Sequence, residues 1–168
     1  MPNPAVILAA WARETKNIRL APAVSLMQLR DPLKVAEDYA LVDQLSGGRV
    51  DMGVAKGFVP HEFDAFHIDQ AEVPERIAEG LEICRKFWAG EPFEYGGNHF
   101  SFDRLQPWPP AVTGALPIWN AASNSRESFL NAAQQGYHLK MNHYPMSAAS
   151  VAEKFGWDCE SWEKAGRN

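Results

Sequence analysis

Cysteine, positive charge and long apolar runs are all scarce in this sequence of 168 residues, and each shortage excludes a class of protein. The two cysteines, Cys84 and Cys159, are far apart and stand outside any CxxC or histidine-rich setting, which argues against a zinc site or a disulfide framework. The net charge of -5 comes without a basic stripe, which argues against nucleic acid as a partner. No apolar run reaches the ~18 residues that a membrane span requires, and no basic leader precedes the first apolar stretch, so we expect a cytoplasmic protein with no membrane partner.

The sequence does have enough apolar material for a core, since 46% of its residues are hydrophobic. Its most informative stretch, residues 31–57, is typical of a helix followed by a short strand. Asp31 is a candidate N-cap, Pro32 falls at the first helical position, and the glycine pair at 47–48 ends the helix. The apolar alternation of residues 50–54 then predicts a strand.

Lys56 and Gly57 follow directly after this predicted strand. A cationic side chain beside a glycine at the carboxyl end of a strand suits an anion such as a phosphate. The alternative is a solvated lysine at the entry to a loop, and spacing alone does not separate the two interpretations.

The rest of the chain alternates predicted helices and strands. Residues 58–69 read as an irregular loop rich in aromatic and titratable side chains, where binding residues tend to collect. The other predicted elements are helix 4–15, strand 17–24, helix 74–90, a hairpin over 93–102, strand 116–122, a helix that starts at 123–126 and ends at 136, strand 137–141, and one or two helices near 147–155 and 161–165.

Strands that alternate with helices at this spacing predict a parallel α/β sheet. The pattern gives about four parallel strands with flanking helices and a small β-hairpin insertion, which we interpret as a partial (β/α)8 TIM-type barrel. A closed barrel needs eight strands and typically about 250 residues. A small open, doubly wound sheet is the alternative architecture.

Four segments, in this order and spacing, are similar to the bacterial luciferase-like, flavin-dependent monooxygenase family. They are TKNIRLAPAV (15–24), DPLKVAEDYALVDQLSGGRVDMGVAKG (31–57), the EF-AF-ID spacing of residues 62–69, and IWNAASNSRESFLNAAQQG (118–136). The second segment is the most specific. The resemblance runs from residue 4 to residue 136 and covers only the middle of the family's domain.

This resemblance implies an eight-stranded barrel that binds reduced flavin, usually FMN, at the carboxyl ends of its strands. The bound cofactor and O2 then oxidise a small organic substrate, while the protein holds the flavin and excludes water. A flavin reductase is implied as the source of the reduced cofactor. A deazaflavin cofactor that transfers hydride without oxygen is the alternative within the same class.

The resemblance also assigns cofactor-binding roles, position by position. The peptide bond between residues 23 and 24 matches the family's non-proline cis peptide against the flavin ring, and Lys56 matches a basic residue that meets the flavin phosphate. Two serines match hydroxyl positions at a phosphate-facing helix start, and one glutamate matches an acidic position near the flavin. The six positions are Ala23, Val24, Lys56, Glu62, Ser125 and Ser128.

The sequence departs from the family at both ends. The family's first two strands, with the histidine segment that supplies its acid–base group, would lie before Met1, and its last two strands beyond Asn168. We therefore expect residues 1–168 to form one incomplete, truncated barrel domain, and we assign no catalytic residue, because none of the five histidines occupies the acid–base position.

A second hypothesis follows from these departures: a non-catalytic half-barrel that self-associates. A homodimer through helices 4–15 and 31–45 would use their alanine-rich faces, although core packing explains the same alanines.

Overall fold

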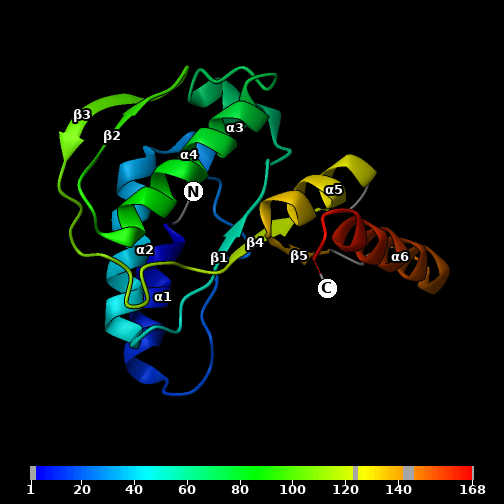
Figure 1. Ribbon diagram of the computed structural model, residues 1–168, viewed down its shortest axis with the longest axis horizontal. Helices are drawn as coiled ribbons and strands as arrows, with labels where there is room; N and C mark the ends of the chain where they lie inside the picture. Colours follow the sequence, from blue (N-terminus) through cyan, green and yellow to red (C-terminus); the bar gives the residue numbers. More distant parts are fainter. Residues whose placement is uncertain (1–2, 123–124, 142–145, 168) are drawn as a thin grey trace. The chain divides into compact units, whose positions relative to one another are not determined.

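The computed structural model describes residues 3–122, 125–141 and 146–167, and its chain divides into two compact units, residues 1–116 and 117–168 (Figure 1). The first unit holds, in chain order, α1 (Pro4–Glu14), the 3-10 turn η1 (Met27–Leu29), α2 (Pro32–Ser46), β1 (Met52–Val54), α3 (Pro60–Ala65), α4 (Val73–Ala89), β2 (Phe93–Gly96) and β3 (Ser101–Leu105). The second unit holds β4 (Ile118–Ala121), α5 (Arg126–Gln135), β5 (His138–Lys140) and α6 (Ala148–Lys164).

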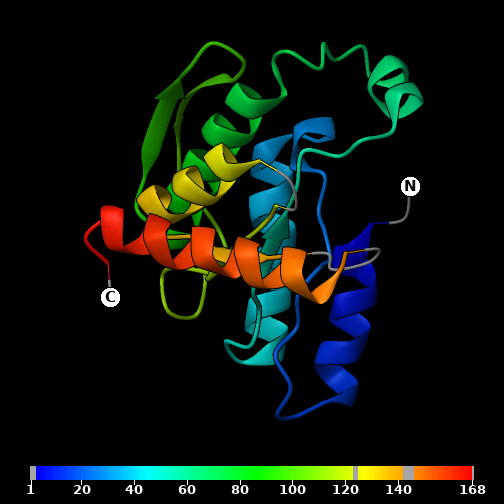
Figure 2. The same ribbon diagram turned by 90° about the vertical axis from the view of Figure 1, so that its right-hand side faces the viewer.

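Helix α2 has the ends that its sequence predicts. The Asp31 carboxylate accepts hydrogen bonds from the backbone N–H groups of Leu33 and Lys34 at 2.9 and 3.1 Å, and Pro32 stands where an N–H would have no partner. Gly47 closes the helix with a φ of 72°, which glycine adopts without steric cost. The buried face of α2 packs against α1 on one side and α4 on the other, and Figure 2 shows α1 beside α2.

Arg49 fastens the carboxyl ends of α1 and α2 together. Its guanidinium donates to the carbonyl oxygens of Ala12, Thr15, Ile18 and Ser46 and to the Thr15 hydroxyl, at 2.8–3.0 Å. A cation is favourable at helix carboxyl ends because the last carbonyl groups there lack helical partners. The arginine after the glycine pair is therefore a structural residue of this motif.

Asp43 holds a distant segment against α2. This carboxylate is buried, and it accepts hydrogen bonds from the backbone N–H groups of Val50 at 3.2 Å and Val112 at 2.9 Å. Beside it, the Gln44 side chain donates to the Pro110 carbonyl oxygen at 2.8 Å. Both carboxylate oxygens of Asp43 are thus paired, as a buried charge requires.

The predicted strand over residues 17–24 is wrong in its extent. The structure has two isolated parallel bridges there, Leu20 with Val50 and Ser25 with Val54. Pro22 lies between them and has no N–H to donate, which interrupts the ladder. Of the four expected parallel strands, three are therefore present among the described residues, as β1, β4 and β5.

One further expectation needs correction, and the structure makes a second one definite. Residues 58–69 are not wholly irregular, because Pro60 starts the short helix α3 and Glu62 adds a negative charge to its first turn. The end of the chain forms one helix, α6, with Ser147 as its N-cap, where one or two helices were expected. Gly156 lies inside α6 without ending it, because the packing of α6 against α5 outweighs the weak helix propensity of one glycine.

Helix α4 and the hairpin form the other side of the first unit. Cys84 and Trp88 lie in the buried face of α4, and the Trp88 indole N–H donates to the Ala36 carbonyl oxygen of α2 at 3.0 Å. Cys84 is a core residue, as predicted, and its burial raises the pKa of its thiol. The antiparallel pair β2–β3 pairs Tyr95 with Phe102 and lies along α4 (Figure 2).

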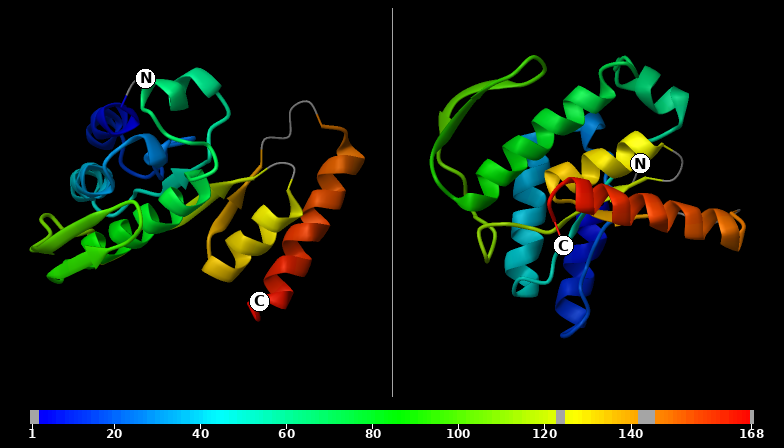
Figure 3. Two further views of the ribbon diagram at one scale, coloured as in Figure 1. Left: turned by 90° about the horizontal axis from the view of Figure 1, so that it is seen from above. Right: turned by 45° about the vertical axis from the view of Figure 1, so that its right-hand side comes forward.

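The second unit is a small α/β layer. Strands β4 and β5 are parallel, with Trp119 opposite His138 and Ala121 opposite Lys140. Helices α5 and α6 pack side by side, as Figure 3 shows, and the rings of Phe129 and Trp157 meet edge to face at 5.8 Å. Parallel strands with flanking helices confirm the predicted α/β class. Among the described residues, no helix combines the length and the apolar character needed to cross a membrane.

Candidate functional site

Residues 23–25 lie beside the carboxyl end of β1. The Ser25 N–H donates to the Gly53 carbonyl oxygen at 2.8 Å, and Ser25 forms a parallel bridge with Val54. The Ala23–Val24 peptide bond is cis, the geometry that the resemblance implies for this position. In α/β barrels, functional residues gather at the carboxyl ends of the strands, so this edge is the first place to look for a site.

Gly53 makes the close approach of these two segments possible. A Cβ atom at this position would lie 2.1 Å from the Pro22 carbonyl oxygen, a distance that no side chain tolerates. The backbones of β1 and residues 22–25 therefore touch directly. Ala23 is exposed and Val24 is half-buried, so this edge offers a small apolar surface to solvent.

Lys56 and Gly57 lie in the irregular segment between β1 and α3. Gly57 has a φ of 72°, and a Cβ atom there would lie 3.3–3.4 Å from side-chain atoms of Leu26, Gln28 and Phe63. The Lys56 carbonyl oxygen accepts a hydrogen bond from the Gln28 side chain at 2.8 Å, while Lys56 itself is exposed. Gln28 thus holds the backbone of Lys56, and the cationic side chain is exposed to solvent, where an anion can reach it.

Glu62 lies in the first turn of α3, six residues after Lys56. Its neighbour Phe63 is buried in a cluster with Leu29 and Val73 and reaches the Gly57 position. Glu62 is half-buried. Packing of Phe63 therefore places α3 beside Gly57, and Glu62 precedes Phe63 in that helix.

Three buried polar atoms near these segments have no hydrogen-bond partner of normal geometry among the described residues: Ser25 Oγ, Gln28 Oε1 and Tyr39 OH. Burial raises the pKa of Tyr39, and the neighbouring Ser25 hydroxyl lowers it in part. We did not single out Ser25 and Gln28 from the sequence. Their position could have identified them, because they are the two polar residues of the otherwise apolar run AVSLMQL (residues 23–29).

Ser125 and Ser128 lie in the second unit, at the start of α5. Ser125 is the N-cap, and its hydroxyl accepts a long hydrogen bond of 3.4 Å from the Ser128 N–H. The first turn also carries Glu127, and Arg126 pairs with Glu160 of α6. Helix α5 thus starts within the predicted range 123–126, of which residues 123 and 124 lie outside the described residues. Lys56 belongs to the first unit, and Ser125 and Ser128 belong to the second.

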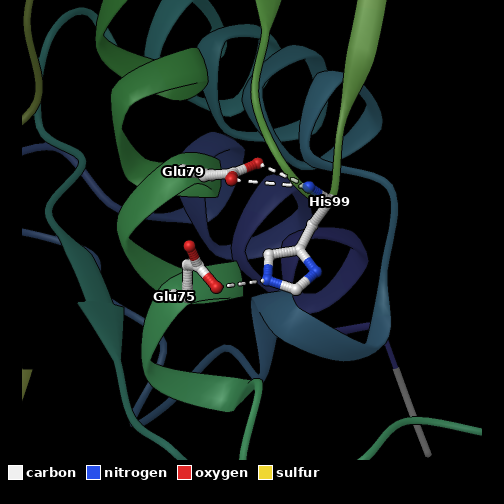
Figure 4. A group of neighbouring side chains, drawn as sticks. All are labelled: Glu75, Glu79 and His99. Carbon is white, nitrogen blue, oxygen red and sulfur yellow. Dashed lines mark hydrogen bonds and ion pairs between the residues drawn. The ribbon is translucent and has the colours of Figure 1, made fainter.

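Glu75, Glu79 and His99 form another cluster of potential ligand atoms, all within 4.8 Å of one another (Figure 4). The Glu79 carboxylate accepts hydrogen bonds from the backbone N–H groups of Asn98, His99 and Phe100 at 2.7–3.4 Å. The Glu75 carboxylate accepts from the Asn98 side chain at 2.6 Å and lies 2.9 Å from His99 Nε2. Each carboxylate is therefore already engaged in fastening the hairpin tip to α4, and this explains the cluster without a metal.

Comparison with known proteins identifies the family of this chain. The family model described as luciferase-like monooxygenase matches residues 1–167. An uncharacterised protein of Sinorhizobium fredii is 34% identical over 82% of this chain and 40% of its own length. The oxygenase component of a flavin-dependent trigonelline monooxygenase of Acinetobacter baylyi is 28% identical over 97% of this chain and 46% of its own length.

Solved structures give the same result for the fold. Monooxygenase RslO1 from Streptomyces bottropensis is 30% identical, with a TM-score of 0.85 over 99% of this chain and 51% of its own. The oxygenating constituent of 3,6-diketocamphane monooxygenase from Pseudomonas putida, in complex with FMN, has a TM-score of 0.87 at 23% identity over 100% of this chain and 50% of its own. A coenzyme F420-dependent tetrahydromethanopterin reductase from Methanopyrus kandleri has a TM-score of 0.81 at 20% identity over 99% of this chain and 51% of its own. The chain spans about half the length of the proteins it matches.

Proposed function

Since the chain belongs to the luciferase-like monooxygenase family, we propose that it forms part of a reduced-FMN site that serves monooxygenation of a small organic substrate by O2. The observation that carries this proposal is the exposed Lys56, two residues beyond the carboxyl end of β1, whose carbonyl oxygen is held by Gln28. Two relatives support the choice of cofactor: one is a flavin-dependent oxygenase component, and the other was solved in complex with FMN.

The residues present suit a flavin mononucleotide. Lys56 offers a point charge to the phosphate, and a lysine pairs with phosphate without the two-pronged geometry of arginine. The hydroxyls of Ser125 and Ser128 can donate to phosphate oxygens at the start of a helix, where anions are favoured. The Ala23–Val24 edge offers an apolar surface to the flavin ring, and Glu62 can accept hydrogen bonds from polar groups of the ligand.

When bound, reduced flavin supplies the electrons with which O2 is activated. The part of this chain is then to bind and orient the cofactor and to exclude water from it. We assign no catalytic residue. A flavin reductase is the partner that this chemistry requires, since the relative from Acinetobacter baylyi is described as an oxygenase component.

Two alternatives have specific support. A deazaflavin of the coenzyme F420 type would use the same edge for hydride transfer, and structural neighbours include proteins dependent on that coenzyme. A non-catalytic half-barrel that self-associates as a homodimer is favoured by apolar side chains that α1 and α2 leave 42–67% exposed: Val6, Ile7, Trp11, Leu41 and Leu45. Exposed apolar groups that gather on packed helices mark interaction surfaces.

Anaerobic titration of the purified chain with reduced FMN, followed by absorbance and fluorescence, tests the proposal. We expect saturable binding that weakens at least tenfold in Lys56→Glu, because the substitution replaces an attraction for phosphate with a repulsion. Lys16→Glu, another exposed lysine of the first unit, is the matched control and should leave the affinity unchanged. Equal effects of the two substitutions would remove Lys56 from the site.

A titration with coenzyme F420 separates the deazaflavin alternative. Preference for F420 over FMN would favour hydride transfer. A folded chain that binds neither cofactor would favour the non-catalytic half-barrel.

A further inference from the structure

Gln28 is a buried residue that forms a hydrogen bond to the backbone of Lys56. It lies in η1 and is 1% exposed, so its side chain is enclosed by protein. Its Nε2 donates to the Lys56 carbonyl oxygen at 2.8 Å, across 28 positions of sequence. The bond also pairs one end of the enclosed Gln28 amide, which would cost free energy if left without a partner.

The contact falls at the point where the chain leaves β1. Lys56 is two residues beyond the last residue of the strand, so no ladder hydrogen bond positions its carbonyl group. Gly57 follows with its positive φ and is surrounded by Leu26, Gln28 and Phe63. Gln28 therefore supplies both the hydrogen bond and part of the packing that fix the backbone from which the Lys56 side chain extends.

We propose that Gln28 is a positioning residue that lets this site discriminate a flavin carrying a 5′-phosphate from the same flavin without one. This inference rests on the proposed function, because it assigns the phosphate to Lys56. Gln28 itself is enclosed, so it acts through Lys56. Its hydrogen bond fixes the backbone from which the Lys56 side chain extends, and less conformational entropy is therefore lost when the ammonium group binds the phosphate.

The buried Gln28 Oε1 supports a role beyond filling space. It has no hydrogen-bond partner among the described residues, although it is enclosed. An apolar side chain of the same size would fill the position without leaving a polar atom unpaired. The amide at this position is explained by its Nε2, which donates a hydrogen bond to the Lys56 carbonyl oxygen.

Paired titrations with FMN and riboflavin test this inference, since the two differ only in the phosphate. In Gln28→Met, which keeps the volume and removes the donor, we expect FMN affinity to fall about 3- to 10-fold while riboflavin affinity is unchanged. The matched control is Gln44→Met, which removes a hydrogen bond of the same kind, from a side-chain amide to the Pro110 carbonyl oxygen. It should leave both affinities unchanged.

A double substitution makes the test specific to Lys56. If Gln28 acts through Lys56, Gln28→Met should add no further loss of FMN affinity when Lys56→Met is already present. Additive losses, or equal losses for FMN and riboflavin, would overturn the inference and assign Gln28 a purely structural role.

Two controls complete the design. Gln28→Glu replaces the donor with an acceptor that repels the Lys56 carbonyl group. It should therefore reduce the ratio of FMN affinity to riboflavin affinity at least as much as Gln28→Met does. If this ratio is unchanged in either folded variant, the inference is overturned. A wild-type chain that binds FMN and riboflavin equally would refute the phosphate site itself, and the positioning role would fail with it.

Discussion

Arg49 shows how much of the fold can depend on one side chain. Its guanidinium reaches acceptors on α1, on the turn over residues 15–18 and on α2, and the carbonyl groups it satisfies would otherwise lack partners. A lysine at this position has one ammonium group and cannot span the same acceptors. Replacing Arg49 with lysine would therefore keep the positive charge but lose most of these hydrogen bonds.

We predict that Arg49→Lys lowers the free energy of unfolding by about 2–3 kcal/mol, since hydrogen bonds from charged donors are among the stronger ones. Urea denaturation followed by circular dichroism measures the change. Arg104→Lys, at an exposed position of β3, is the control and should change the stability by less than about 0.5 kcal/mol. A similar stability for the two variants would contradict the fastening role of Arg49.

Residues whose partners are close in sequence were the predictable ones. Asp31 and Gly47 act on the helix that they flank, so spacing alone identified both. Gln28 and Asp43 escaped prediction because each finds its partner far along the chain, at Lys56 and at Val112. The roles assigned to Lys56, Glu62, Ser125 and Ser128 towards a flavin stay predictions.

At the scale of elements, the β2–β3 hairpin is fastened to α4 by charged groups rather than by a large apolar face. The hydrogen bonds from Asn98 and then His99 lower the pKa of Glu75 below its ordinary value of 4.5. Glu72 faces the other ring nitrogen of His99 at 3.7 Å and also pairs with Arg76. The carboxylates of α4 thus face a histidine and a row of backbone N–H groups at the hairpin tip.

We predict that this fastening weakens in acid. Because the folded-state pKa of Glu75 lies below its unfolded value, its stabilisation is complete above about pH 4.5 and is lost as the pH falls through the folded pKa. The difference in unfolding free energy between wild type and Glu75→Gln should therefore be present at neutral pH and shrink below about pH 4.5.

Urea denaturation at several pH values measures this difference. Glu91→Gln, an exposed carboxylate just before β2, is the control. A difference between wild type and Glu75→Gln that stays constant from neutral pH into acid would contradict the assignment.

Element boundaries depended on tertiary packing more than on local sequence. The sequence predicted a strand at residues 17–24, yet the ladder stops at Pro22 and only two bridges remain. It allowed a break inside residues 147–165, yet α6 continues because it packs against α5. Helix α4 and the hairpin were predicted well, since their periodicities and turn residues agree with the packing.

At the scale of the whole molecule, the order and spacing of segments identified the family and the α/β class before any contact was known. The family match and the structural neighbours confirm both. What the sequence could not supply is the set of contacts that fix the segments in space, because those depend on partners tens of residues apart.

We also predict self-association through the exposed apolar face of α1 and α2. In sedimentation velocity the wild-type chain should form a dimer, and Trp11→Arg should raise the dissociation constant about 30-fold or more, as for a central aromatic residue of an interface. Trp108→Arg is the matched control, because Trp108 is 77% exposed but lies outside that face. A wild-type chain that stays monomeric at all concentrations would refute the interface.

The buried carboxylate of Asp43 has a consequence for the order in which the chain can mature during synthesis. One of its two backbone partners is made 69 residues later, at Val112. At about 5–20 residues per second, a ribosome needs roughly 3–14 s to produce that partner. Until then the Asp43 carboxylate would lack one of its two backbone donors. We therefore expect the first unit to complete its folding only after Val112 has been synthesised.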